Sequence, residues 1–299
     1  MKPRRDFAYS VSRMEEKPPQ FPIEEAVPAL TSALGASRCA VLSAPPGAGK
    51  TTRVPLALLD AAWLGKGKIL MLEPRRLAAR RAAAYMAQQL GERVGHTVGY
   101  RIRGDAAVSK ATRVEVVTEG ILTRMLHDTP ELPGVGLVIF DEFHERSIHA
   151  DLGLAFTLDV QKHLRDDLRV LIMSATLDGV AVAHLLGDAP VIESVGKAFP
   201  VETRYSRFIS DKPLEARIAE VVSRALTAEE GDILVFLPGM REIRRVEEKL
   251  QSQSNEDVVV HVLHGDLSAS VQEAALSPVK PGKRKVILVL LAYFKPLAH

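Results

Sequence analysis

The sequence has a single cysteine, Cys39, among its 299 residues. One cysteine excludes an intramolecular disulfide and a zinc cluster built from several cysteines, and it fits a reducing, cytoplasmic setting. No apolar run approaches the roughly 20 residues that a membrane-spanning helix needs, so we expect no contact with a membrane. The basic N-terminus is not followed by an apolar stretch of the secretory type, and we find no low-complexity tract. We therefore expect a globular cytoplasmic protein.

Charge of neither sign dominates, since the formal net charge is only +2. The distribution is uneven, however. Between Glu73 and Arg103 there are seven arginines and two glutamates, a local excess of five positive charges. Such an excess indicates an anionic partner, with nucleic acid as the leading candidate. A solvated helix face would carry the same charges, and charge alone does not separate the two interpretations.

Short apolar runs alternate with helical patterns from residue 21 onwards. The runs are rich in Val, Ile and Leu and do not alternate with polar residues, as expected for strands covered on both faces. This alternation predicts an α/β domain with a doubly wound, mostly parallel sheet. The expected strands are Cys39–Ser43, Lys68–Leu72, Val114–Thr118, Leu137–Phe140 and Arg169–Met173. The expected helices are Arg75–Leu90, Ile121–Asp128, Ala150–Leu164 and Val180–Leu186.

The pattern pauses around residues 196–200 and then begins again. We expect a flexible extension at 1–20, a first domain at 21–199 and a second α/β domain at 200–299. The second domain is expected to contain helices at Leu214–Leu226 and Glu242–Leu250 and strands at Ile233–Leu237, Val258–Leu263 and Lys285–Leu291.

A phosphate-binding pattern directly follows the first expected strand. Ala44–Thr51 reads A-P-P-G-A-G-K-T, which matches G-x-x-x-x-G-K-[ST] except for Ala44 in place of the first glycine. Small residues let backbone N–H groups surround a phosphate, and the following helix directs its positive end towards it. Lys50 would bind the β- and γ-phosphates and Thr51 would supply a hydroxyl to Mg²⁺. The expected nucleotide contacts are Ala44, Pro45, Pro46, Gly47, Ala48, Gly49, Lys50, Thr51 and Thr52.

A second acidic pattern ends another expected strand, in V-I-F-D-E-F-H-E-R at Val138–Arg146. A phosphate loop needs an acidic group on a neighbouring strand to hold the metal and orient water. Asp141 suits metal coordination through water, and Glu142 suits the general base that activates the attacking water. The alternative is a strand that simply ends in a charged turn.

These segments and three others resemble the motifs of superfamily 2 helicases, in the same order and spacing. The others are P-R-R at Pro74–Arg76, T-E-G at Thr118–Gly120 and S-A-T at Ser174–Thr176. Together they are most similar to the DEAH/RHA branch, and D-E-F-H-E-R with L-E-P-R-R-L-A-A-R resembles the bacterial HrpB-type helicases. The resemblance covers roughly residues 21–288. It implies a P-loop NTPase with one complete RecA-like domain and a second RecA-like domain that is incomplete.

The resemblance also implies roles for single residues. Pro74, Arg75 and Arg76 match one contact with the backbone of single-stranded nucleic acid, and Thr118, Glu119 and Gly120 match the next. Ser174 and Thr176 match the element that couples ATP hydrolysis to domain movement, although the residues alone would indicate an ordinary turn. His144 matches a catalytic-site histidine that contacts a glutamine of the second domain.

Some positions depart from the family pattern. Tyr85 stands where the family usually has an arginine that stacks on adenine, and Leu276 stands at the apolar position expected on the other face of the base. This pair predicts that the base is held between two side chains that form no hydrogen bonds with it. We therefore expect weak discrimination among nucleoside triphosphates.

The C-terminal part departs further. The chain ends V-L-L-A-Y-F-K-P-L-A-H and lacks Q-R-x-G-R-x-G-R, which supplies the glutamine and the arginine fingers in the family. Loss of such a finger costs about 10³ to 10⁵ in rate in other nucleotide hydrolases. We therefore expect a helicase core truncated in its second domain, with an exposed apolar edge and marginal folding beyond about residue 200.

Two functions follow from these observations. The first is an ATP- and Mg²⁺-dependent helicase core that acts on single-stranded nucleic acid, with RNA favoured over DNA by the family resemblance. The second is a catalytically weak module that binds ATP and RNA.

Overall fold

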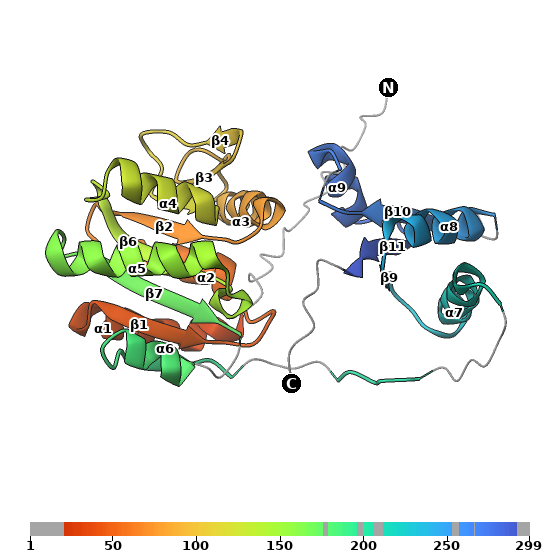
Figure 1. Ribbon diagram of the computed structural model, residues 1–299, viewed down its shortest axis with the longest axis horizontal. Helices are drawn as coiled ribbons and strands as arrows, with labels where there is room; N and C mark the ends of the chain where they lie inside the picture. Colours follow the sequence, from red (N-terminus) through yellow and green to blue (C-terminus); the bar gives the residue numbers. More distant parts are fainter. Residues whose placement is uncertain are drawn as a thin grey trace, which may run out of the picture. The chain divides into compact units, whose positions relative to one another are not determined.

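The computed structural model describes residues 21–175, 179–195, 200–205, 212–252, 257–265 and 267–291 (Figure 1). The chain divides into two compact units, residues 1–200 and 201–299, and each is described here by itself. The expected extension at 1–20 and the expected coupling residue Thr176 lie outside the described residues.

The first unit is built on one eight-stranded sheet, in the order β4-β3-β5-β2-β6-β7-β1-β8. Neighbouring strands are parallel except β3 and β4, which are antiparallel. The strands are β1 Cys39–Ser43, β2 Lys68–Leu72, β3 Val98–Ile102, β4 Asp105–Ala107, β5 Val114–Val117, β6 Val135–Phe140, β7 Arg169–Ser174 and β8 Val191–Glu193. The predicted α/β fold with a mostly parallel sheet is confirmed.

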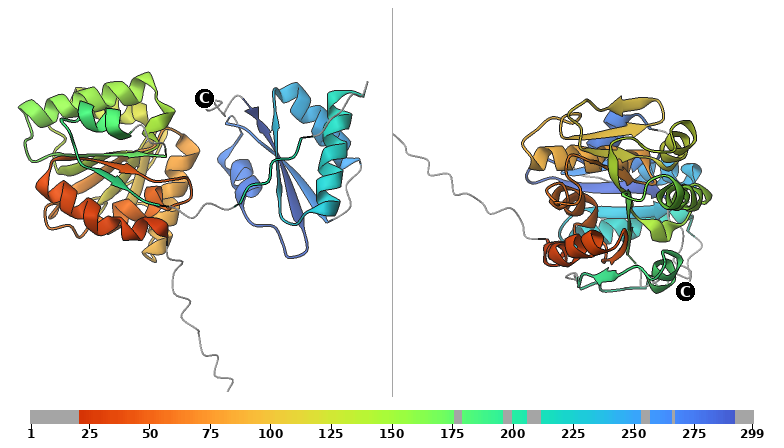
Figure 2. Two further views of the ribbon diagram at one scale, coloured as in Figure 1. Left: turned by 90° about the horizontal axis from the view of Figure 1, so that it is seen from below. Right: turned by 90° about the vertical axis from the view of Figure 1, so that its left-hand side faces the viewer.

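Helices cover both faces of this sheet (Figure 2). Helices α1, α2 and α3 pack on one face, and α4 and α5 pack on the other. Strand β6 shows why: Leu137 and Ile139 join the core under α1–α3, whereas Val138 and Phe140 join the core under α4 and α5. Successive strand residues point to opposite faces, so a sheet buried on both sides needs a continuous apolar run. The helices are α1 Val27–Ala36, α2 Lys50–Ala57, α3 Arg76–Gln89, α4 Glu119–Asp128, α5 Ile148–His163 and α6 Gly179–Leu185, with short 3₁₀ helices η1 at Pro22–Glu25 and η2 at Phe143–Glu145.

Many of the expected boundaries differ from the observed ones by one or two residues, and two of these differences concern predicted site residues. Thr118 is not part of β5 but precedes α4, which begins at Glu119 rather than Ile121. Arg75 has extended backbone angles and precedes α3. Both residues lie at strand-to-helix junctions, where the chain leaves a buried strand and reaches the surface.

The second unit has a three-stranded parallel sheet in the order β10-β11-β9. Its strands are β9 Ile233–Leu237, β10 Val258–Leu263 and β11 Arg284–Leu290, and its helices are α7 Leu214–Ala228, α8 Met240–Gln251 and α9 Ala269–Leu276. Helices α7 and α8 share a core with the sheet. Strand β9 forms an edge, and its Leu234 and Phe236 are 50% and 40% exposed. An apolar edge of the expected kind is therefore present in the described residues.

Candidate functional site

Most residues of the candidate site in the first unit gather at one edge of the sheet. Ala44, Asp141 and Ala175 directly follow β1, β6 and β7, and Glu73 and Thr118 directly follow β2 and β5. These five strands are parallel, so their carboxyl ends meet at the same edge, where open α/β sheets bind ligands. The chain order alternates strand and helix, and this brings together residues that are far apart in the sequence.

The loop between β1 and α2 has the conformation that its glycines predict. Gly47 and Gly49 have φ angles of 78° and 93°, in the left-handed region that glycine adopts at low cost. A Cβ atom on Gly49 would lie 2.9 Å from the ring of Phe21, so this position also has no room for a side chain. Ala44 has no positive φ, and its N–H donates to the carbonyl of Ser174 at 3.0 Å. The replacement of the usual first glycine by Ala44 is therefore compatible with the loop.

Lys50 and Glu142 form an ion pair in this site. Lys50 is only 4% exposed, and its Nζ lies 3.0 Å from Oε1 of Glu142. Glu142 has a φ of 48°, which is uncommon for a residue with a side chain. The turn after β6 thus directs the carboxylate of Glu142 at the lysine of the phosphate loop.

Asp141 is buried beside this pair. Its Oδ1 accepts a hydrogen bond from the N–H of Glu142 at 2.8 Å, and among the described residues its buried Oδ2 has no hydrogen-bond partner. Burial, followed by the charge of Glu142, raises the pKa of Asp141 to about 6, against the effects of Thr51 and Lys50. A buried acceptor without a donor is costly unless another group satisfies it.

The unsatisfied oxygen of Asp141 fits Mg²⁺ or a water bound to it. Mg²⁺ prefers oxygen ligands and is usually held by one or two carboxylates together with substrate phosphates. Thr51 supplies a hydroxyl near Asp141. In the described parts of the chain, no group of three or more His, Cys, Asp or Glu residues could hold a metal by itself. The residues present therefore suit a metal that arrives with a nucleotide.

His144 lies next to the S-A-T segment within the same unit. Its Nδ1 accepts a hydrogen bond from the N–H of Ala175 at 3.3 Å and is 3.4 Å from Oε2 of Glu142. Nδ1 cannot accept from Ala175 and donate to Glu142 in the same protonation state. A backbone N–H can only donate, so the Ala175 contact places the proton of neutral His144 on Nε2. No sequence pattern indicates this contact.

The two segments expected to bind nucleic acid lie near this edge. Arg75 and Arg76 are exposed, and Pro74 between them and β2 is half-buried. The guanidinium of Arg75 forms an ion pair with Glu145 at 2.7 Å. Arg76 begins α3.

The second segment surrounds the start of α4. Thr118 precedes the helix, and Oε2 of Glu119 accepts a hydrogen bond from the hydroxyl of Ser147 at 2.7 Å. A Cβ atom on Gly120 would meet no atom within 4 Å, so open space surrounds this glycine. The N–H groups at a helix start, next to open space, suit a phosphate.

Several arginines of the stretch from Glu73 to Arg103 are neutralised by acidic residues from elsewhere in the chain. Arg80 pairs with Asp105 at 2.6 Å, and Arg101 pairs with Glu115 at 2.7 Å. Together with Glu145, which pairs with Arg75, these acids lie outside the stretch that carries the arginines. Sequence counting over that stretch therefore overstated the charge available to an anionic partner.

Sequence reasoning missed Glu73, which follows β2 and is 4% exposed. Burial, followed by the charges of Asp141, Glu142 and Glu145, raises the pKa of Glu73 to about 9, while Arg75 opposes the shift. The only sequence signal is its position between a buried strand and the P-R-R segment. Glu73 adds a further carboxyl group to the acidic end of the site.

The remaining predicted residues are only partly tested by the structure. Ser174 ends β7 and is buried, next to the phosphate loop. Tyr85 lies on α3 with 42% of its surface exposed, and Leu276 ends α9 in the second unit. The predicted base sandwich of Tyr85 and Leu276 therefore stays a prediction.

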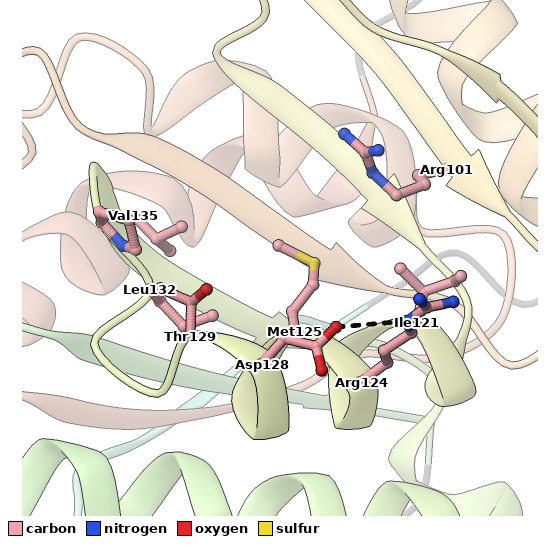
Figure 3. Close-up of a pocket in the computed structure, with 9 residues that line it drawn as sticks. Arg101, Ile121, Arg124, Met125, Asp128, Thr129, Leu132 and Val135 are labelled. Carbon is pink, nitrogen blue, oxygen red and sulfur yellow. Dashed lines mark hydrogen bonds and ion pairs between the residues drawn. The ribbon is translucent and has the colours of Figure 1, made fainter.

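A separate pocket of about 440 Å³ lies beside α4 in the first unit (Figure 3). Apolar side chains such as Met125 line it, and two arginines border it. Both arginines are paired, Arg101 with Glu115 and Arg124 with Asp128. None of the predicted site residues is among those that line this pocket.

Comparison with known proteins gives one family. The family model described as DEAD/DEAH box helicase matches residues 23–184. The chain is 50% identical over 268 residues to the ATP-dependent RNA helicase HrpB of Escherichia coli. This match covers 90% of this chain and 33% of that protein. It is 31% identical over 252 residues to the ATP-dependent RNA helicase HrpA of Borreliella burgdorferi, covering 83% of this chain and 30% of that protein.

Solved structures agree with these relatives. A crystal structure of the E. coli DEAH/RHA helicase HrpB matches with a TM-score of 0.83 and 49% identity, over 91% of this chain and 35% of that one. A second, of the E. coli DExH-box NTPase HrpB, matches with a TM-score of 0.74 and 48% identity, over 92% and 34%. The chain thus spans about a third of the length of the curated relatives that it matches. In its described residues, no helix is long and apolar enough to cross a membrane.

Proposed function

Because the chain belongs to the DEAD/DEAH box helicase family, as its sequence predicts, we propose that it forms an ATP-dependent helicase core. In this proposal it hydrolyses ATP with Mg²⁺ and uses the energy to move along nucleic acid or unwind it. Residues 21–199 are then a RecA-like ATP-binding domain, and residues 200–299 are part of a second RecA-like domain.

The observation that carries the proposal is the ion pair between Lys50 and Glu142. It puts the cation of a phosphate loop within 3.0 Å of a carboxylate on the adjoining turn. A nucleotide phosphate that binds Lys50 competes with this carboxylate. Once displaced, Glu142 is free to accept a hydrogen bond from a water and to remove its proton during attack.

The neighbouring residues suit the other requirements of phosphoryl transfer, which is mainly positioning and electrostatic stabilisation. The N–H groups of the phosphate loop orient the phosphates. Thr51 and Asp141 would hold Mg²⁺, which neutralises charge on the phosphates when it is bound. His144, through its contact with Ala175, links the turn that carries Glu142 to the S-A-T segment. We infer that Ser174 and Thr176 belong to the coupling element.

The partner that we propose is single-stranded nucleic acid, with Arg75, Arg76 and the start of α4 as contacts. The relatives HrpB and HrpA are named as RNA helicases, which favours RNA over DNA. Contacts with phosphate and sugar imply little sequence preference. A cytoplasmic setting remains our expectation from the single cysteine.

The test is ATP hydrolysis by the full chain, with and without single-stranded RNA or DNA. Lys50→Ala and Glu142→Gln serve as controls, and excess EDTA removes divalent metal. We expect turnover that RNA stimulates and that both substitutions and EDTA abolish. Saturable binding of ATP and RNA without turnover would support the second function, a catalytically weak binding module. Turnover that persists in Lys50→Ala would contradict both.

A further inference from the structure

The turn after β6 is held in an unusual backbone conformation. It begins at Glu142 and ends at Arg146, which have φ angles of 48° and 41°. Residues with side chains rarely adopt positive φ, and they keep it only where surrounding contacts impose it. The conformation of this turn therefore depends on the contacts that residues 142–146 make. The position of the Glu142 carboxylate depends on the same contacts.

Two contacts join the turn to the elements that directly precede and follow it in the chain, β6 and α5. The ring of Phe143 packs edge-on against Phe140, with centroids 6.2 Å apart. Arg146 forms a bidentate pair with Asp151, at 2.9 and 3.0 Å. These groups lie within β6, the turn and α5, so they fix the turn whether or not a ligand is present.

The contact of Glu145 is different, because its partner belongs to a segment expected to bind nucleic acid. Oε1 of Glu145 lies 2.7 Å from Nη2 of Arg75, and the two side chains are 36% and 48% exposed. An ion pair this exposed is weak, with an effect of at most about fivefold on an equilibrium. A phosphate that binds Arg75 bidentately makes stronger, charge-assisted hydrogen bonds and can displace the carboxylate.

Glu145 is hydrogen-bonded to the backbone of Glu142, the residue that carries the proposed catalytic carboxylate. Its N–H donates to the carbonyl of Glu142 at 2.9 Å, so the two residues close a single turn of backbone. The other nucleic-acid segment reaches the same loop, since Glu119 accepts a hydrogen bond from Ser147 directly after the turn. Both segments thus contact the stretch that carries Glu142.

We propose that Glu145 is a positioning residue that couples nucleic-acid binding to the Glu142 turn. Without nucleic acid Glu145 occupies Arg75, and a phosphate of the bound strand takes its place. Release of Glu145 removes one of the contacts that fix the turn and lets Glu142 adjust to the nucleotide. The inference rests on the proposed function, because it assigns Arg75 to nucleic acid and Glu142 to ATP.

The experiment measures the affinity of the full chain for a labelled single-stranded RNA of mixed sequence, without nucleotide. Glu145→Gln and Glu145→Ala should bind the RNA about two- to fivefold more tightly, because Arg75 has lost its competitor. In an Arg75→Gln background the same substitutions should have no effect. The factor by which RNA changes the affinity for a non-hydrolysable ATP analogue should fall towards one in both Glu145 variants.

Asp188→Asn is the matched control, because it removes one exposed negative charge near α6, far in sequence from both segments. It should leave RNA affinity and the coupling factor unchanged.

If Glu145 has a purely structural role, the Glu145 variants would unfold at a lower urea concentration without binding RNA more tightly, and that result overturns the inference. If RNA binds but the Glu145 variants match wild type, the inference is wrong and the proposed function stands. If Lys50→Ala and Glu142→Gln leave turnover unchanged, the proposed function is wrong, whereas tighter RNA binding by the Glu145 variants would still support the competition.

Discussion

Nζ of Lys50 lies 3.0 Å from Oε1 of Glu142, so the cation expected to bind phosphate and the carboxylate expected to activate water neutralise each other. Lys50 is buried, and a buried lysine needs such a partner. In the proposed function, nucleotide binding therefore exchanges one anion for another at Lys50. This exchange would release the proposed general base only when its substrate is present.

Glu142→Gln should separate binding from turnover. Removal of the competing negative charge should strengthen nucleotide binding by about fivefold, the upper range for a partly exposed pair. Loss of the general base should slow hydrolysis by about 10² to 10⁴. Titration with a fluorescent ATP analogue measures the first effect and phosphate release measures the second. Weaker nucleotide binding by Glu142→Gln than by wild type would contradict the competition, and Lys50→Ala should lose binding altogether.

Glu73 predicts a dependence of stability on pH in the metal-free chain. Its pKa is raised from an ordinary value of 4.5 to about 9, so between these values the folded chain holds a proton that the unfolded chain has lost. Stability therefore falls as pH rises through this window, by at most about 1.4 kcal/mol per pH unit. Urea unfolding in EDTA at about pH 6 and about pH 8 measures the slope. Glu73→Gln should flatten it, and an equally steep slope in that variant would assign the effect to another group.

Arg76 should contribute one phosphate contact without sequence preference. Arg76→Gln should weaken binding of several single-stranded RNA sequences by the same factor and reduce the slope of log affinity against log salt by about one. Lys162→Gln is the charge-matched control, because Lys162 is exposed near the end of α5, at the opposite edge of the sheet. An unchanged slope in Arg76→Gln would remove this residue from the interface.

Tyr85 should accept any purine base. Its exposed ring offers stacking but no charge, so we expect comparable kcat/KM for ATP and GTP. Tyr85→Phe should keep this behaviour, whereas Tyr85→Ala should raise KM for both nucleotides. A strong preference of the wild-type chain for ATP would show that another group reads the base.

The second unit should unfold before the first. Its sheet has three strands in the described residues, and Leu234 and Phe236 of its edge strand are partly exposed. The first unit has eight strands with apolar cores on both faces. Limited proteolysis followed by mass spectrometry should therefore cut within 201–299 first and leave a fragment of the first unit. Equal resistance of both units would contradict this expectation.

The buried strands were predictable because their apolar runs are long and uninterrupted. Strands β1, β2, β9 and β10 have the predicted bounds. Strands β3, β4 and β8 were missed, because β3 carries Tyr100 and Arg101 among its apolar residues and because β4 and β8 are only three residues long. Strands β4 and β8 also form the two edges of the sheet, and edge strands are half-covered, so their sequences need not be apolar throughout.

Local motifs predicted which residues lie close together in the first unit better than charge did. The phosphate loop and the acidic turn are contiguous in sequence, and their geometry follows from strand ends and glycine positions. The pairs of Arg75 with Glu145 and of Arg101 with Glu115 join residues that are distant in sequence. No composition or spacing rule reveals such partners, because they depend on the order of strands in the sheet.

The opposite edge of the first sheet has a practical use. The predicted site residues that directly follow strands of the first unit all lie at the carboxyl ends of those strands. The loop at 164–167, in contrast, leads into the amino end of β7. Asp166 and Asp167 are exposed there. A fluorophore, affinity tag or surface tether attached at this loop would leave accessible the residues proposed to bind nucleotide and nucleic acid. The loop is therefore a suitable attachment site for single-molecule experiments.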